Sequence, residues 1–159
     1  MRKMLIGIHD KNCSLRAVSY VMKQYPKGQD LDVTFVHVLP NLPAMYWDDG
    51  HLLNSREKQE RKKVVDTLTA RQREYIEPII EGAMGELVKK GFARERVRMK
   101  FVLGSADVAD SLLDEAAAMK CDTVVIGRCG IADGKHLIAG GTVSKLIHKA
   151  VGLAICVVQ

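Results

Sequence analysis

Five short, apolar and β-branched runs, separated by helical patterns, limit this chain to one class of fold. Runs of this length and composition are typical of strands that are buried on both faces of a sheet. They cover residues 3–8, 31–39, 97–103, 123–126 and 152–158. Strands joined by helices are parallel, with right-handed crossovers. The sequence therefore predicts an α/β fold, with a doubly wound, five-stranded parallel sheet and helices on both faces.

The expected helices follow the 3.6-residue spacing of apolar side chains. Ser14 is a candidate N-cap for the first helix. A long helix is expected from Ser55 to about Lys90, with an apolar stripe from Val64 to Val88. Pro78 must kink or divide this helix, because proline lacks an N–H group and crowds the preceding turn. The segment 40–54 reads as an irregular binding loop.

Composition bounds the chain to a single domain, residues 1–159, that is 47% hydrophobic and 27% charged. No apolar run is long enough to cross a membrane and no signal peptide is recognisable, so a cytoplasmic location without a membrane partner is expected. The four cysteines show no paired spacing, so reduced thiols are expected. Acidic residues interrupt the basic run after Ser55, which makes a nucleic-acid partner unlikely.

A glycine-rich stretch follows the fourth predicted strand. Gly127 and Gly130 allow a sharp turn in which main-chain N–H groups are accessible. Gly140 and Gly141 then lead into a helix for which Thr142 is a candidate N-cap. A helix N-terminus after such a turn favours an anion, so the stretch reads as a phosphate cradle. The alternative to phosphate binding is that these glycines only form the turns of an ordinary loop, because the stretch matches neither the P-loop motif nor GxGxxG.

This stretch resembles the Gly-x2-Gly-x9-Gly-Ser/Thr signature in the ATP-binding branch of the universal stress protein family. The glycines at 127, 130 and 140 keep that spacing. The Gly-Thr-Val-Ser at 141–144, which resembles the family's Gly-Ser-Val-Ser, starts one residue later. Weaker similarities lie at 6–10, 36–38 and 102–106, so the resemblance covers nearly the whole chain.

The resemblance implies the strand order 3-2-1-4-5, an adenine nucleotide alpha hydrolase-like fold, and a homodimer formed through the fifth strand. It also implies a ligand, ATP or AMP with or without Mg, at the switch between strands 1 and 4. His9 takes the place of the family's nucleoside-binding Asp, and the main chain of Val38 takes that of the adenine contact. The nucleotide-binding positions carried over are His9, Asp10, Val38, Gly127, Arg128, Gly130, Gly140, Gly141, Thr142, Val143 and Ser144.

Two functions of different class remain open from the sequence. The first is a regulatory module of the stress response that binds an adenine nucleotide; the second is a homodimeric, stress-linked interaction protein that has lost nucleotide binding. The retained glycines favour the first, and His9 favours the second. Enzyme activity beyond slow ATP hydrolysis is poorly supported, because Asp10, Asp133 and Lys135 are the only charged candidates near the cradle. A redox role for Cys129, inside the glycine turn, is a minor alternative.

Overall fold

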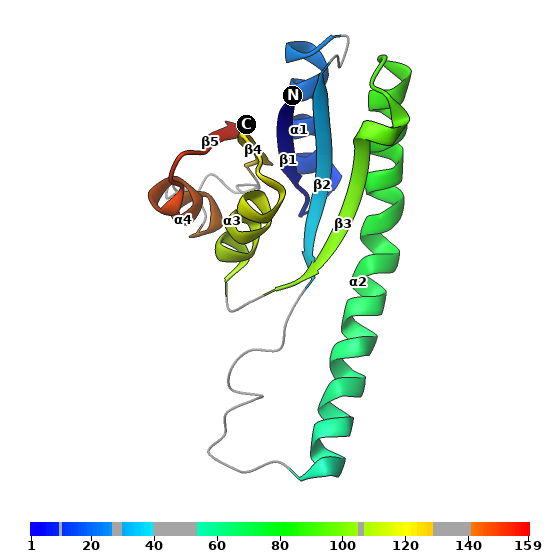
Figure 1. Ribbon diagram of the computed structural model, residues 1–159. Helices are drawn as coiled ribbons and strands as arrows, with labels where there is room; N and C mark the ends of the chain where they lie inside the picture. Colours follow the sequence, from blue (N-terminus) through cyan, green and yellow to red (C-terminus); the bar gives the residue numbers. More distant parts are fainter. Residues whose placement is uncertain (10, 27–29, 40–53, 105–106, 129–140) are drawn as a thin grey trace.

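The computed structural model describes residues 1–9, 11–26, 30–39, 54–104, 107–128 and 141–159. Its core is one parallel sheet of five strands in the order β3-β2-β1-β4-β5, which confirms the predicted fold and strand order (Figure 1). The strands are β1 (Arg2–Gly7), β2 (Leu31–Leu39), β3 (Val97–Leu103), β4 (Thr123–Gly127) and β5 (Ala154–Val158). The helices are α1 (Lys11–Gln24), α2 (Ser55–Lys89), α3 (Val108–Met119) and α4 (Gly141–Lys149), with a 3-10 turn at Arg94–Arg96.

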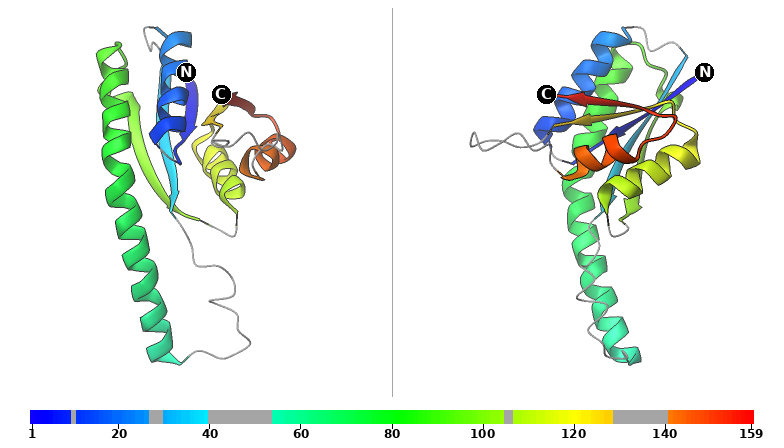
Figure 2. Two further views of the ribbon diagram at one scale, coloured as in Figure 1. Left: turned by 180° about the vertical axis from the view of Figure 1, so that it is seen from behind. Right: turned by 90° about the vertical axis from the view of Figure 1, so that its left-hand side faces the viewer.

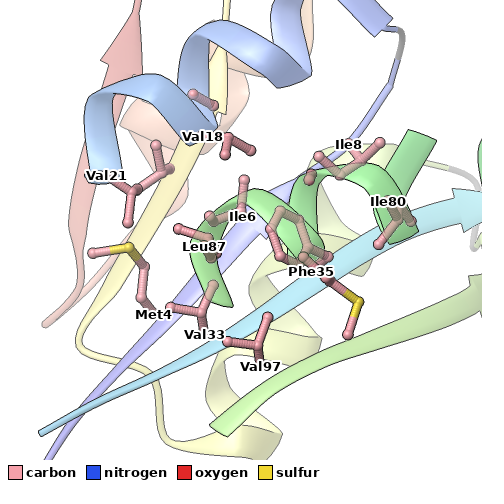
Figure 3. Packing of buried hydrophobic residues seen from close by; sticks show 14 of the residues in the cluster. Met4, Ile6, Ile8, Val18, Val21, Val33, Phe35, Ile80, Leu87 and Val97 are labelled. Carbon is pink, nitrogen blue, oxygen red and sulfur yellow. The ribbon is translucent and has the colours of Figure 1, made fainter. Parts of the chain in front are cut away.

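Two hydrophobic layers hold the helices on the sheet, one on each face. Successive residues of β1 point to opposite layers: Ile6 packs under α1 and α2, and Leu5 under α3 and α4. Figure 2 shows the two helical layers on either side of the sheet. In the α1 and α2 layer, Phe35 lies between Ile80 and the strand residues around it (Figure 3). Phe35 is fully buried, so truncating it to Ala costs about 3–5 kcal/mol of stability.

Two predicted helix starts are wrong. α1 begins at Lys11, so Ser14 lies within the helix on its buried side and is not its N-cap. The earlier start places Cys13 in the first turn of the helix, where it packs against Gly127 at the end of β4. α4 begins at Gly141, so Thr142 lies in the first turn of the helix and not at the cap.

Helix α2 differs from its prediction in two ways. It continues through Pro78 as one helix, because this proline lies on the exposed side, where water can bond the carbonyl that proline leaves without a partner. The apolar stripe is buried only from Ile76 onwards, and Val64, Leu68 and Tyr75 are 51%, 42% and 60% exposed. Figure 1 shows why: the first half of α2 extends past the edge of the sheet, where no strand faces it. A capping box between Asn54 and Glu57 starts the helix.

Candidate functional site

The carboxyl ends of β1 and β4 meet at the point where the strand order reverses. β1 lies between β2 and β4, with Gly7 opposite Val36 on one side and Ile126 on the other. From β1 the chain continues to α1 on one face of the sheet, and from β4 it continues to α4 on the other. Ligands of open α/β sheets bind in the crevice outside the strand ends at such a switch point. The candidate site is therefore this edge.

Gly127, the first glycine of the predicted cradle, has a packing role. A Cβ atom added there would lie 2.2 Å from the carbonyl oxygen of Cys13 and 2.8 Å from its Cβ. Real atoms do not approach this closely without a backbone shift, so only glycine lets the first turn of α1 pack against the end of β4. This glycine is required for the fold whether or not a ligand is bound.

Arg16 joins α1 to the residue that follows β4. Its Nη2 donates a hydrogen bond to the carbonyl oxygen of Arg128 at 3.1 Å, and lies 3.4 Å from the sulfur of Cys13. The main-chain N–H of Arg128 donates to the carbonyl of Val158 at 2.7 Å, which adds one rung to the β4–β5 ladder. The guanidinium of Arg128 has no hydrogen bond or ion pair within the described residues, so a cation is available at this edge.

The oxidation state of the cysteines corrects the sequence prediction of reduced thiols. Cys121 and Cys156 are free, but Cys13 is disulfide-bonded. Its sulfur lies 3.6 Å from the carbonyl oxygen of Arg128, beside the switch point. The pattern of cysteines gave no sign of this contact, because Cys13 and Arg128 are far apart in sequence.

Gly141, the first residue of α4, is not crowded by the described part of the chain. A Cβ added there would meet none of the described atoms within 4 Å, in contrast to Gly127. The main-chain N–H groups in the first turn of a helix have no intrahelical partners, and they favour an anion. Of the other predicted residues here, Thr142, Val143 and Ser144 are half-buried in that first turn. This arrangement leaves room for a group that approaches the main chain.

Asp107 brings the starts of α3 and α4 together. As the N-cap of α3 it accepts a hydrogen bond from the N–H of Ala109 at 2.8 Å, and its second oxygen pairs with Lys145 of α4. The ammonium of Lys145, followed by the amide of Ala109, holds the pKa of Asp107 below its usual value. A further ion pair joins Lys149 to Asp110 at 2.6 Å. The charge of Lys145 is therefore partly balanced within the protein.

Val38 presents main-chain groups beyond the end of β1. In a parallel ladder, alternate residues direct their N–H and C=O groups to the same side of the strand. The carbonyl of Val36 accepts from the N–H of Ile8 at 2.9 Å, so the groups of Val38 face the same side, past the last rung of β1. Within the described residues, neither group has a hydrogen bond on that side. One donor and one acceptor of Val38 are thus without a hydrogen-bond partner at the switch point in the described part of the chain.

His37 was missed as a site residue by the sequence analysis, which noted only that the histidines lack metal-ligand spacing. It is 2% exposed, and its Nδ1 lies 2.8 Å from the carbonyl oxygen of Ile8. Its Nε2 has no partner in the described part of the chain. Burial lowers the pKa of His37, although the hydrogen bond to Ile8 opposes this effect. Its position as a polar residue within the apolar run from Phe35 to Leu39 was the available signal.

The remaining predicted residues are only partly placed. His9 is exposed and follows the last rung of β1, so it lies at the same edge as Gly127 and Arg128. Asp10, Gly130 and Gly140 lie outside the described residues, as do Asp133, Lys135 and the loop 40–53. Across the ranges that the structure describes, no group of three or more His, Cys, Asp or Glu side chains could hold a metal ion.

The fold and this edge define the class of the protein: an α/β protein with a nucleotide-binding type of parallel sheet and a switch point between β1 and β4. The family model described as "Universal stress protein family" matches residues 1–151. The chain belongs to the universal stress protein family. Among curated proteins, no significant match to this sequence was found. In the described residues, no helix is long and apolar enough to span a membrane.

Solved structures share this fold at low sequence identity. The hypothetical protein MJ0577 is 18% identical over 99% of this chain and 94% of its own, with a TM-score of 0.71. The universal stress protein from Archaeoglobus fulgidus in complex with dAMP is 12% identical over 100% of this chain and 98% of its own, with a TM-score of 0.62. A universal stress protein family protein from Arabidopsis thaliana with AMP bound is 12% identical over 99% and 91%, with a TM-score of 0.54.

Proposed function

We propose that this protein is a regulatory module that binds an adenine nucleotide, ATP or AMP, at the edge between β1 and β4. The observation that carries the proposal is the main chain of Val38 beside the end of β1, which has no hydrogen bond on that side to any described residue. Adenine offers an amino donor next to a ring-nitrogen acceptor, so a main-chain acceptor and donor on one side of one residue match its edge. The base would lie beyond the end of β1, where the main chain of Val38 would hydrogen-bond to it.

The phosphates would lie towards β4 and α4. The guanidinium of Arg128 supplies a cation without a partner in the described residues, and the open space at Gly141 lets a phosphate reach the first-turn N–H groups of α4. The glycines at 130 and 140 complete the motif by sequence. A phosphate bound through main-chain N–H groups needs few side chains, so the loss of the family's Asp at His9 need not abolish binding. Mg would accompany ATP through its phosphates.

Relatives with the same fold support the nucleotide class. The Archaeoglobus fulgidus protein was solved with dAMP and the Arabidopsis thaliana protein with AMP. Both ligands have an adenine base, which is the part that the main-chain groups of Val38 would recognise.

The second candidate is an interaction protein that acts as a homodimer without nucleotide. His9, in place of a carboxylate, favours this function because an imidazole would not replace the contact that the family's Asp makes with the nucleoside. A dimer through β5 is compatible with the sheet: among the described strands β5 pairs only with β4, and its residues Ile155, Cys156 and Val157 are half-buried. We propose the same dimer for the nucleotide-binding form.

Native mass spectrometry of the purified protein tests the proposal. We expect one adenine nucleotide per chain after incubation with ATP or AMP, and no adduct with Gly130→Val, whose branched side chain would stand where the phosphate approaches. His9→Asp is the matched variant that should keep the adduct. Absence of any adduct in the wild type, with an intact dimer mass, would favour the interaction protein.

A further inference from the structure

We propose that helix α2 pairs in an antiparallel orientation with α2 of a second copy of this chain. The covered face would begin on the half of α2 that extends past the edge of the sheet and would continue along the outer side of the other half (Figure 1). α2 packs against β2 and β3, whereas β5 is the strand at the opposite edge of the sheet. This interface is therefore separate from a contact through β5, and it does not depend on nucleotide binding.

An exposed apolar stripe runs along this face of α2. Val64, Leu68 and Tyr75 are separated by four and seven residues, so they lie on one side of the helix. Their side chains are 51%, 42% and 60% exposed. Gly82 follows seven residues after Tyr75, and a Cβ added there would meet none of the described atoms within 4 Å. Apolar positions that alternate by four and seven residues are typical of a seam between two helices.

Charge is distributed unevenly along the same helix. Residues 56–73 carry seven basic and three acidic side chains, whereas residues 74–88 carry four acidic side chains and no basic one. The helix dipole favours acidic residues towards the N-terminus and basic residues towards the C-terminus. α2 has the reverse overall distribution, so the stability of the helix by itself does not account for it. A helix that runs in the opposite direction would place its acidic half against the basic half of α2.

Four of these charges border the apolar stripe on one side. Lys63 and Arg71 belong to the basic half, and Glu74 and Glu81 to the acidic half. All four side chains are exposed, and none of them forms an ion pair with a described residue. In a pair with two-fold symmetry, each contact between two positions occurs twice. An antiparallel pair centred near residue 72 would place Lys63 beside Glu81 of the second copy and Arg71 beside Glu74 of the second copy.

The same register suits the apolar stripe. Val64 would face Gly82 of the second copy, where the missing side chain leaves room, and Leu68 would face Tyr75 of the second copy. The overlap from residue 63 to residue 82 is roughly 30 Å long. One helix face per copy buries less than a standard interface, so we expect self-association in the roughly micromolar range. The complementary halves of α2 favour a second copy over an acidic partner, which would match only the basic half.

Charge reversal in the full chain tests this pairing, with sedimentation as the measure of mass across a range of concentrations. One variant carries Glu74→Lys and Glu81→Lys, and the other carries Lys63→Glu and Arg71→Glu. In each variant like charges would face each other across the pair, so self-association should weaken by at least about tenfold. An equimolar mixture of the two variants should recover the mass of the wild type, because a basic face then meets an acidic one.

Two control variants separate this contact from general effects of charge and hydrophobicity. Arg98 and Lys120 are exposed on the α3 side of the sheet, so reversing both to Glu should leave the mass unchanged. Leu68→Ser should weaken self-association by about tenfold. Val108→Ser removes a side chain of similar exposure, 43%, from α3 and should have no effect.

The mixture also serves as a test of folding, since only folded variants can restore the mass. A mass that either charge reversal on α2 leaves unchanged would overturn the proposal. A mass that falls in both variants and is not restored in their mixture would overturn it as well, because the opposite halves of α2 would then not face each other.

Discussion

The imidazole of His37 bonds to the end of the neighbouring strand: its Nδ1 lies 2.8 Å from the carbonyl oxygen of Ile8. A side chain of β2 therefore takes the position at which the next main-chain rung from Val38 would otherwise form. Among the residues that the structure describes, this leaves the N–H and carbonyl groups of Val38 without a partner at the switch point. The hydrogen bond also fixes the tautomer, because only a protonated Nδ1 can donate to a carbonyl.

Stability should depend on pH through His37. Burial lowers the pKa of His37 in the folded protein, so the unfolded chain binds more protons as pH falls from about 7 through the ordinary value of about 6.5. The neutral imidazole makes its full contribution to the free energy of unfolding above that pH, and this contribution is lost progressively as the pH falls below it. Urea unfolding between pH 7.5 and about 5.5 should show a falling free energy in the wild type. The free energy of unfolding of His37→Gln, whose side chain cannot titrate, should change less with pH. Equal slopes for the two proteins would contradict the assignment of this pH dependence to His37.

Two glycines of the same motif should respond differently to alanine. Gly127→Ala places a Cβ against the carbonyl of Cys13, so we expect a loss of about 1–3 kcal/mol in the free energy of unfolding. Gly141→Ala meets nothing within 4 Å and should change stability by less than about 0.5 kcal/mol. The same variant should weaken ATP binding by about three- to tenfold, roughly 1 kcal/mol. Chemical denaturation measures the stability of both variants, and titration measures their affinity for ATP. Equal destabilisation by the two variants would contradict the different roles of the two glycines.

The sequence was sufficient to predict part of the fold, but not the contacts that form the candidate site. Alternation of strands and helices was sufficient for the class of fold, because few topologies bury five apolar strands. The strand order came from the resemblance to the universal stress protein family. The role of Gly127 could not be read in this way, since the contact that requires glycine comes from Cys13, far away in sequence. The exposed start of α2 also escaped prediction, because an apolar spacing such as Val64 to Leu68 does not reveal where the sheet ends.

The main chain of Val38 can be tested with proline. Val38→Pro removes an N–H group that has no hydrogen bond in the described structure, while the extended backbone and its position beyond the end of β1 tolerate the ring. Adenosine and ATP should both bind about tenfold more weakly, the effect of one hydrogen bond of about 1.4 kcal/mol. Val38→Ala, which keeps the N–H group, should bind as the wild type does. Equal affinities for Pro and Ala would place the base elsewhere.

Arg128 should discriminate between ligands with and without phosphates. Arg128→Met keeps the length of the side chain but removes the charge, so ATP should bind about tenfold more weakly, whereas adenosine should be unaffected. The difference should shrink in high salt, because the lost contact is electrostatic. Lys62→Met, on the exposed start of α2, is the matched control and should have no effect. An equal loss for adenosine would assign Arg128 a structural role.

Calorimetric titration of ATP into the wild type, Gly130→Val and His9→Asp tests the central claim most directly. Binding through main-chain groups of the glycine motif predicts measurable heat with the wild type, none with Gly130→Val, and equal or tighter binding with His9→Asp, which restores the family's carboxylate. Circular dichroism of each variant establishes that the fold is retained. No binding by the wild type at millimolar ATP, together with binding by His9→Asp, would show that this chain has lost its nucleotide and acts as an interaction protein.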